Sequence, residues 1–189
     1  MSPRGPLATG ERVYLRRLQP RDCDAFVAAV LASRKLHRPW VTPADTAAAF
    51  AEKMRRSRGS SDDRLVICRI EDDAVAGSFS LGQIFRGPLR SAYLGYYAFT
   101  PFAGQGYMRE GLALVCDHAF GAHKLHRLQA NIQPGNAASL AFVRGAGFTK
   151  EGLARRYLKI GGRWQDHEAW ALLAEDPRAR SPRGRQRGA

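Results

Sequence analysis

The sequence predicts a mixed α/β domain built on a single sheet with helices against its faces. Two kinds of segment predict this class: aromatic-rich or alternating stretches typical of strands, and stretches whose apolar residues recur at helical spacing. In chain order they give a strand, two helices, three strands, a helix, a strand, a helix and two strands. The strands at 91–99 and 126–132 are joined through a helix. They should therefore be parallel neighbours connected by a right-handed crossover.

The N-terminal half alternates short elements with turns. Arg12 to Leu18 alternates apolar residues as a strand does, and the helix that opens near Pro20 places Phe26 and Val30 on one face. A turn at 37–40 precedes a helix that begins at Asp45. The acidic turn at 71–73 suits a tight connection between two strands. The expected elements are strand 12–18, helix 20–31, helix 45–56, a polar loop at 58–63, strand 64–70 and strand 74–85.

The C-terminal half is marked by proline and glycine. Pro101 bounds an aromatic strand, and Pro134 with Gly135 breaks the strand that follows the central helix. Asn136 is a suitable N-cap for the next helix, and the pair at 161–162 turns a final hairpin. The expected elements are strand 91–99, helix 107–120, strand 126–132, helix 137–144 and strands 148–160 and 164–173.

Length and composition predict one domain. A chain of 189 residues, 44% of them hydrophobic, can bury a sizeable core. We expect a flexible lead-in at 1–10, the domain at 11–176 and a disordered arginine-rich tail at 177–189. The three cysteines form no CxxC pair, so neither a disulfide framework nor a zinc site is indicated. No window approaches the ~18 apolar residues of a membrane span, and a cytoplasmic location without membrane contact is expected.

The chain is strongly basic. Its formal charge is +13, from 30 Lys and Arg against 17 Asp and Glu. Five arginines and no acidic residue follow Pro177, so the rest of the chain carries +13 − 5 = +8. Such a surface favours a polyanionic partner, either a phosphorylated cofactor, an acidic protein or RNA. A basic surface that serves solubility alone is the open alternative.

A glycine-bearing turn between the aromatic strand and the central helix is the strongest local signal. Gly104 and Gly106 lack Cβ atoms, so an anion can approach the main chain where the helix begins. A dinucleotide fingerprint would need a third glycine where Arg109 stands, and the Gly-Lys-Ser/Thr of an ATP loop is absent. We expect this turn to bind the pyrophosphate of a cofactor, against the alternative of an ordinary glycine turn.

Motifs spread along residues 11–176 carry a more specific resemblance. They are Arg38-Pro39-Trp40, Tyr93-Leu94-Gly95-Tyr96, Gly104-Gln105-Gly106-Tyr107-Met108, His126-Arg127, Ala130-Asn131, Pro134-x-Asn136, Gly147-Phe148-x-Lys150-Glu151-Gly152 and Tyr157-Leu158-x-Ile160-x-Gly162-x-Trp164-x-Asp166-His167. In this order and spacing the chain resembles the GNAT acetyltransferase superfamily. Within it, the chain is most similar to the RimJ-type ribosomal-protein-alanine N-acetyltransferases. Ala103 and Met108 depart from the family's consensus turn at its first and last positions.

The resemblance implies a fold and a cofactor. The fold would be a sheet of about seven mostly antiparallel strands, with one splayed parallel pair and about four helices. Acetyl-coenzyme A would lie between the splayed strands without a metal, its pantetheine arm pairing with the strand edge at Tyr97, Ala98 and Phe99. A backbone N–H near Ala98 or Phe99 would polarise the thioester carbonyl. The residues expected to bind the rest of the cofactor are Gly104, Gln105, Gly106, Tyr107, Met108, Arg109 and Asn136.

The resemblance also suggests catalytic and acceptor residues. Ser139 would protonate the leaving thiolate, with a purely local hydrogen bond as the alternative. Asn131 stands where many relatives carry a glutamate base; it cannot take the proton but could orient a water or the amine. The base stays unassigned between Asp166 or His167 and ordered water. Trp40 and Tyr157 would line the acceptor slot, unless they only pack. The spacing of His118, His123 and His126 fits no zinc pattern.

The resemblance implies an N-acetyltransferase that acts on a primary amine by direct attack. The expected acceptor is a protein N-terminus, such as that of a ribosomal protein, with contact to ribosomal RNA through the basic surface and a homodimer as a compatible assembly. Two alternatives stay open. One is an acetyltransferase for a small-molecule amine, and the other is a non-catalytic module that binds RNA or the ribosome.

Overall fold

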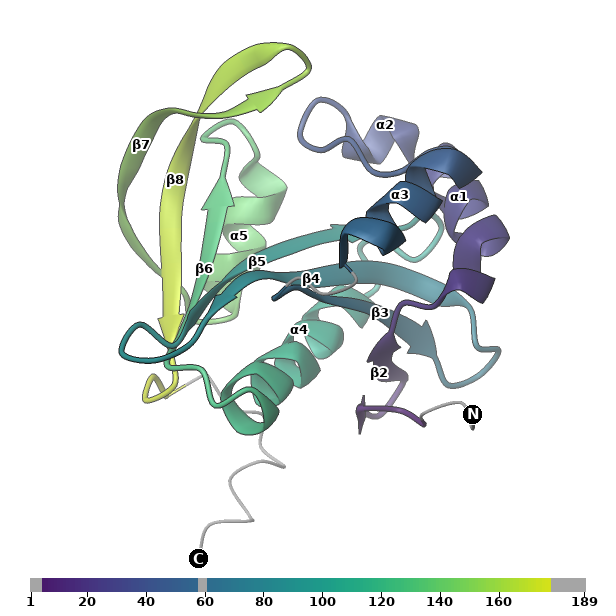
Figure 1. Cartoon of the computed structure of the whole chain (residues 1–189), viewed down its shortest axis with the longest axis horizontal. Coiled ribbons are helices and arrows are strands. Elements are labelled where there is room, and N and C mark those ends of the chain that lie inside the picture. Colours follow the sequence, from purple (N-terminus) through teal and green to yellow (C-terminus); the bar gives the residue numbers. More distant parts are fainter. Residues whose placement is uncertain (1–4, 58–60, 178–189) are drawn as a thin grey trace, which may run out of the picture.

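The fold is one mixed sheet with helices on both faces (Figure 1). The computed structural model describes residues 5–57 and 61–177. The sheet has the order β1-β2-β3-β4-β5-β6-β8-β7, and all neighbours are antiparallel except β5 and β6. The strands are β1 (Ala8–Thr9), β2 (Val13–Arg17), β3 (Asp63–Arg69), β4 (Val75–Phe85), β5 (Ser91–Ala98), β6 (Arg127–Ile132), β7 (Thr149–Ile160) and β8 (Arg163–Leu173).

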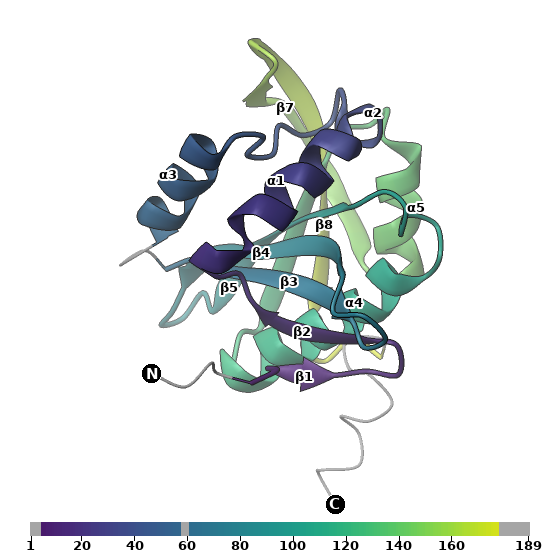
Figure 2. The ribbon, with the colours of Figure 1, turned by 90° about the vertical axis from the view of Figure 1, so that its right-hand side faces the viewer.

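The helices divide between the two faces (Figure 2). One group packs over β2 to β5, and the other packs on the opposite face of the sheet. The first group is α1 (Cys23–Ala32), α2 (Arg34–His37) and α3 (Ala47–Ser57), and the second is α4 (Tyr107–Asp117) and α5 (Ala137–Gly145). A short 3₁₀ turn at Pro20–Asp22 precedes α1, and a π-helical turn at His118–Ala122 follows α4.

The predicted fold class is confirmed, with two local differences. The described chain has eight strands rather than about seven, because Ala8 and Thr9 pair with β2 at the sheet edge. The lead-in expected at 1–10 therefore does not include Ala8 and Thr9, because these two residues belong to the sheet. The expected turn at 37–40 is preceded by the short helix α2. Sequence reasoning missed this helix because Pro39 and Trp40 indicated only a turn. Residues 58–60 of the expected polar loop and 178–189 of the expected tail lie outside the described residues.

Two apolar clusters fill the two faces. The larger one lies between the sheet and α4 with α5, and includes Leu112 and Val115. The smaller one lies under α1 and α3, and includes Phe26 and Phe50. No helix of the described chain is both long and apolar enough to span a membrane. The sheet is therefore buried on both faces in its middle, which leaves its far edges and strand ends for binding.

Gly111 sets how closely α4 approaches the sheet. A Cβ built there would lie 2.6 Å from Ile67 Cγ2 and 3.3 Å from Phe79 Cε2, and both partners are buried. Since a packed core has no room to yield, only glycine permits this separation.

We expect Gly111→Val to destabilise the protein by about 1–3 kcal/mol in urea unfolding, because the added methyl groups overpack this contact. Gly121→Val is the matched control, since a Cβ at exposed Gly121 meets nothing within 4 Å. Equal free energies of unfolding for the two variants would contradict the close-contact account.

Candidate active site

The candidate site is a fork between the two parallel strands. β5 and β6 pair only through Ser91 with Arg127, Ala92 with Leu128 and Tyr93 with Gln129. Beyond these pairs β5 continues to Ala98 and β6 to Ile132 without pairing to each other. Figure 1 shows the strands diverging toward α2. The predicted splayed parallel pair is therefore present, with main-chain groups of both strands released at the opening.

Of the three residues predicted to contact the pantetheine arm, one presents its main chain to the fork. Phe99 is already satisfied, because its N–H donates to Ala76 O at 3.0 Å and its C=O accepts from Phe102 N–H at 2.8 Å. Successive strand residues present these groups to opposite edges, so those of Tyr97 also face β4, where Tyr97 opposes Ser78. The expected cofactor contacts at Tyr97 and Phe99 are thus corrected, since β4 uses their main-chain groups. Ala98 alone of the three faces away from β4.

His37 completes this edge. Its Nε2–H donates to the Ala98 carbonyl at 2.8 Å, which leaves the Ala98 N–H turned to the fork. The ring is 4% exposed and packs edge-on against Tyr97, with centroids 5.2 Å apart. His37 Nδ1 has no hydrogen-bond partner among the described residues. Sequence reasoning missed this histidine because its only signal was a place in a predicted turn.

The glycine turn at 104–109 is open to solvent, as the cofactor prediction requires. Gly106 is the N-cap of α4 with φ of +85°, and Gly104 has φ of +78°. Side chains rarely adopt these left-handed angles, so glycine is needed at both positions. A Cβ at Gly104 would meet nothing within 4 Å. A Cβ at Gly106 would lie 3.0 Å from Arg12 Nη2. The first N–H groups of α4 lie at the positive end of the helix dipole.

Two arginines far away in the sequence support the turn. Arg12 Nη1 donates to Gln105 O at 3.1 Å, and its guanidinium lies 4.8 Å from the centre of the Tyr107 ring. Arg69 Nη1 donates to the Tyr107 hydroxyl at 3.2 Å. Each guanidinium is also paired with carboxylates, Arg12 with Glu110 and Arg69 with Glu71 and Asp72, so the two arginines brace the turn rather than add unpaired charge. Sequence reasoning missed both arginines because Arg12, just before β2, and Arg69, at the end of β3, reach the turn only in the folded chain.

The remaining turn residues differ in role. Gln105 Nε2 donates to Pro101 O at 2.7 Å, so its side chain closes the loop. The Met108 thioether occupies the space beside Gly77 on β4, and is therefore a packing group. Arg109 is exposed. The side chains of Gln105 and Met108 are thus used within the fold, whereas that of Arg109 is exposed to solvent.

Glu110 fixes the start of α4 to the N-terminal strands. Its Oε1 accepts from the backbone N–H groups of Glu11 at 2.6 Å and Arg12 at 2.8 Å, and Arg12 Nε lies 3.3 Å from Oε2. Burial works to raise the pKa of Glu110, but these hydrogen bonds outweigh it and lower the pKa. The ionised carboxylate thus holds the arginine against the turn.

Two hydroxyl groups meet on the cofactor side of the fork. Tyr96 and Ser139 lie 2.5 Å apart, oxygen to oxygen, and Tyr96 also packs on Phe142 with ring centroids 4.9 Å apart. Burial raises the pKa of Tyr96, so its hydroxyl stays protonated across the neutral range. Asn136 Oδ1 accepts from the Ser139 N–H at 3.1 Å, which is the predicted N-cap of α5. Sequence reasoning selected Ser139 but missed Tyr96.

The opposite face of the fork carries the expected acceptor residues. Leu128, Ala130 and Ile132 of β6 are buried in the cluster with α4 and α5, so the residues between them point to the other face. There Asn131 Nδ2 donates to the Tyr157 hydroxyl at 3.2 Å, and its Oδ1 accepts from Gln129 at 2.9 Å. Asn131 and Tyr157, predicted separately, are therefore one polar group.

Trp40 lies at the rim of this face. Its backbone carbonyl accepts from Gln133 Nε2 at 3.3 Å, and its ring lies against Gly135. It therefore connects the α2 side of the fork to the loop that leads into α5.

Two residues of the β7–β8 hairpin are the open candidates for the base. Asp166 Oδ1 accepts from the Arg156 N–H, and His167 is buried with its Nδ1 near Gln165 O. Their contacts are internal to the β7–β8 hairpin.

The site thus combines a forked strand pair, a glycine-bearing helix start on one face and a polar group on the other. Comparison with known proteins agrees. Residues 12–149 match the model of the acetyltransferase (GNAT) domain. The probable N-acetyltransferase YjcK of Bacillus subtilis is 33% identical over 175 residues, covering 88% of this chain and 97% of that protein. The [ribosomal protein uS5]-alanine N-acetyltransferase of Escherichia coli is 26% identical, covering 89% and 91%.

Solved structures agree with this match. Mycobacterium smegmatis RimJ, in complex with a CoA-disulfide, superposes with a TM-score of 0.80 at 31% identity, covering 86% of this chain and 82% of that one. The ribosomal-protein-S5-alanine acetyltransferase of Vibrio fischeri shares the fold at a TM-score of 0.77 and 24% identity, covering 89% and 96%. The chain therefore belongs to the GNAT acetyltransferase family, and it is an acetyl-CoA-dependent N-acetyltransferase.

Replacing Gly106 tests the turn. We expect Gly106→Ala to weaken coenzyme A binding about tenfold, because the methyl group disfavours φ of +85° and would lie 3.0 Å from Arg12 Nη2. Isothermal titration calorimetry measures the effect. Gly161→Ala is the control: its φ is also positive, at +56°, but it lies in the β7–β8 turn with nothing within 4 Å of the new Cβ. Equal affinities of the two variants for coenzyme A would argue against the glycine turn as part of the cofactor site.

Lys53 gives a pH-dependent prediction. Its Nζ donates to the Tyr97 hydroxyl at 3.0 Å, and burial, with the nearby charge of Arg64, lowers the pKa of Lys53 from 10.5 to about 8. Between these pH values the unfolded chain binds more protons, so this residue's contribution to stability rises with pH. The Tm of Lys53→Met minus that of the native protein should therefore fall between pH 8 and 10.5.

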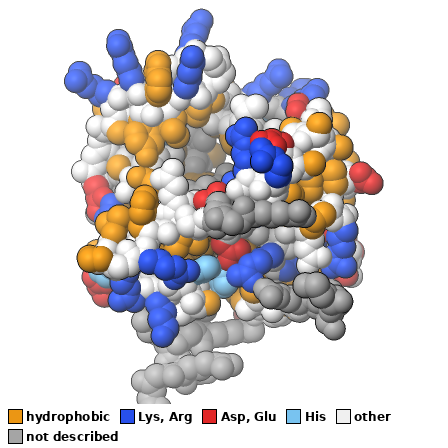
Figure 3. Space-filling view, in the orientation of Figure 1, with side chains coloured by type: hydrophobic (Ala, Val, Ile, Leu, Met, Phe, Trp, Pro, Cys, Tyr) orange, Lys and Arg blue, Asp and Glu red, His pale blue; other side chains and the backbone are white. Residues whose placement is uncertain are grey.

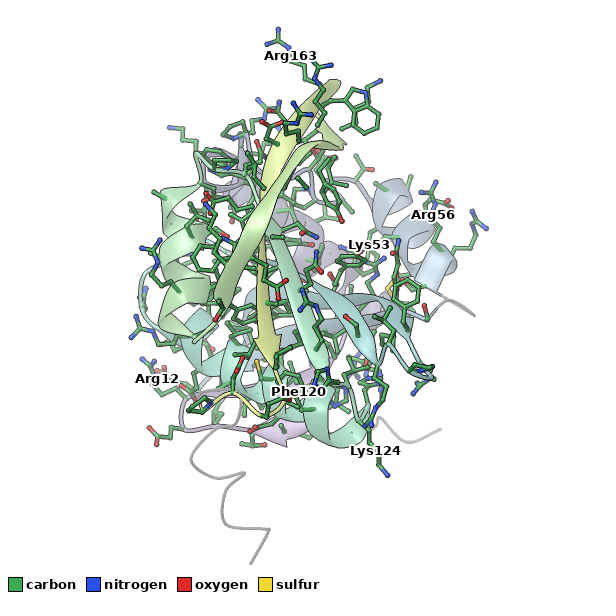
Figure 4. All side chains as sticks on the ribbon, turned by 90° about the vertical axis from the view of Figure 1, so that its left-hand side faces the viewer. Arg12, Lys53, Arg56, Phe120, Lys124 and Arg163 are labelled. Atoms are coloured by element: carbon green, nitrogen blue, oxygen red, sulfur yellow. The ribbon has the colours of Figure 1, made fainter. Side chains whose placement is uncertain are left out.

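Arg56→Met is the control, on the same helix. Figure 4 shows Arg56 projecting outward from α3, while Lys53 lies nearer the sheet. Because arginine does not titrate in this range, the Tm difference for Arg56→Met should stay constant. A constant difference for Lys53→Met as well would mean that its ammonium group is not desolvated in the folded state.

Proposed function

We propose that this enzyme transfers an acetyl group from acetyl-coenzyme A, held in the β5–β6 fork, to a protein N-terminal α-amine such as that of a ribosomal protein. The observation that carries the proposal is the fork itself. It opens beyond the pair Tyr93–Gln129, with the glycine turn and Ser139 on one face and Asn131 with Tyr157 on the other. A thioester lying through the opening is thus reachable by an amine from the far side.

The cofactor would be held mainly by main-chain groups. The pyrophosphate accepts from N–H groups of Gly104 to Arg109, with Arg12 and Arg69 supporting the turn. The pantetheine amides pair with the β5 edge, where the Ala98 N–H polarises the thioester carbonyl. Asn136, at the rim where α5 begins, contacts the cofactor in addition to capping the helix.

In the reaction the amine nitrogen attacks the thioester carbonyl carbon, so a C–N bond forms and the C–S bond breaks. Ser139 donates its proton to the departing thiolate and takes one from Tyr96 through their 2.5 Å hydrogen bond. The attacking nitrogen releases its second proton to solvent as the amide forms, and Tyr96 regains a proton from solvent, so both hydroxyl groups return to their starting state. Asn131 and Tyr157 orient the amine, and ordered water takes the ammonium proton. Burial and neighbouring Tyr93 raise the pKa of Tyr157, which keeps it a hydrogen-bonding group rather than a base.

The charges around the acceptor face favour a singly charged amine over a polyamine. A polycation needs several unpaired carboxylates, but Glu151, which reaches Arg127 on this side of β6, is paired with that arginine. The basic surface would repel a polycation and attract a target surrounded by ribosomal RNA. A small singly charged amine stays the second candidate.

Two hydroxyl variants test the acid. Ser139→Ala should lower kcat by roughly 100-fold, while the Kd for coenzyme A changes less than about threefold, because only the departing thiolate loses a proton donor. Tyr96→Phe should lower kcat less, by about tenfold, since Ser139 keeps its own proton for the first step. Steady-state kinetics and calorimetry on the same preparations separate the two quantities. An unchanged kcat in Ser139→Ala would remove Ser139 from the mechanism.

Mass spectrometry of intact proteins tests the acceptor class. Cells with and without the enzyme are compared for proteins that gain one acetyl group at the N-terminus. Acetylation of ribosomal N-termini supports the proposal, whereas acetylated small amines alone would support the second candidate.

A further inference from the structure

Asp63, His118 and His123 form a compact polar cluster away from the fork. His118 Nε2 and His123 Nε2 each lie 2.9 Å from Asp63 Oδ2, and the three atoms that could bind a metal all lie within 4.8 Å of one another. Asp63 is 5% and His118 8% exposed, while His123 is half-buried. The acetyl transfer described above uses none of these residues.

The π-helical turn after α4 brings the two histidines together. The His123 N–H donates to His118 O at 3.1 Å, so residues five apart stack on one side of the turn. Their imidazole rings lie edge to face with centroids 4.8 Å apart. An ordinary α-helix would rotate residues five apart away from each other. Single π-turns are frequent at functional sites.

Arg17 holds the carboxylate from its other side. Arg17 Nε lies 2.9 Å from Asp63 Oδ1, and Nη2 lies 3.2 Å from Oδ2. Oδ2 therefore faces three nitrogen groups but has only two lone pairs to offer. A cation between the imidazoles and Oδ2 would resolve this excess, and the Arg17 bond to Oδ1 would orient the ligating carboxylate, as outer-shell partners do in metal sites.

We propose that Asp63 Oδ2, His118 Nε2 and His123 Nε2 bind a divalent transition metal of the zinc class. Two imidazole nitrogens and one carboxylate oxygen suit Zn²⁺, Co²⁺ or Ni²⁺, whereas Ca²⁺ and Mg²⁺ prefer all-oxygen sets. Zinc would take its fourth ligand from water. The metal would join the start of β3 to the end of α4, the helix whose other end forms the glycine turn, so its role is structural.

A surface depression borders the cluster at His123. An open depression of about 400 Å³ is lined by His123 together with Phe85, Arg86, Gly87, Arg90, Ala122, Lys124 and Leu125. Figure 3 shows histidine side chains reaching the surface low on that face, beside acidic and basic groups. The sequence spacing could not reveal this site, because Asp63 lies 55 residues before His118.

Cobalt absorption and zinc calorimetry on the untagged full chain at pH 7.5 test the proposal. One equivalent of Co²⁺ should give visible d–d bands of four-coordinate geometry, and one equivalent of Zn²⁺ should displace it and raise the Tm. His123→Gln and His118→Gln should each weaken zinc binding by roughly 100-fold or more, beyond the cost of losing an outer-shell partner.

His126→Gln is the matched control, since His126 belongs to the same segment but pairs with exposed Glu175. It should bind zinc as the native chain does. The proposal is wrong if the native chain binds neither ion, or if both cluster variants bind zinc as tightly as the native chain. Should His118→Gln fail to fold, half-buried His123→Gln gives the answer alone. Neither readout depends on acetyl transfer.

Discussion

The structure depends on an interruption of pairing between two parallel strands. β5 and β6 share three residue pairs and then separate, which leaves main-chain groups without partners where a sheet would normally satisfy them. Such groups are costly unless water or a ligand meets them. The opening therefore costs the fold some stability. The same unpaired groups at the Ala98 edge are available to bind the amides of a cofactor.

The rest of the chain holds this opening in place. Two apolar clusters pack on opposite faces of the sheet, one against α4 and α5 and the other against α1 and α3. Arg12 and Arg69 support the glycine turn at one side, and Glu110 ties the start of α4 to β2. His37 and Trp40 reach from the α2 side to Ala98 and to the loop before α5. Long-range contacts thus fix a site whose binding groups are mostly backbone.

Residue spacing and backbone preference predicted the elements that depend mainly on neighbouring residues in the chain. The strand, glycine turn and helix order at 91–120, and the Asn136 cap, follow from residue spacing and backbone preference, and all are present. The predicted use of Phe99 was wrong because hydrogen-bond direction depends on register with β4. The Tyr96–Ser139 pair and the Asp63 cluster could not be found by spacing, since tertiary packing brings together residues 43 and 55 positions apart.

Amide hydrogen exchange with and without acetyl-coenzyme A tests the central claim most directly. If the fork and the turn hold the cofactor, protection should increase at Ala98 and across residues 103–109, with little change at the 3₁₀ turn or at the exposed end of the β7–β8 hairpin, where Arg163 projects away from the body (Figure 4). Unchanged exchange at both Ala98 and the turn, despite saturating cofactor, would contradict the account.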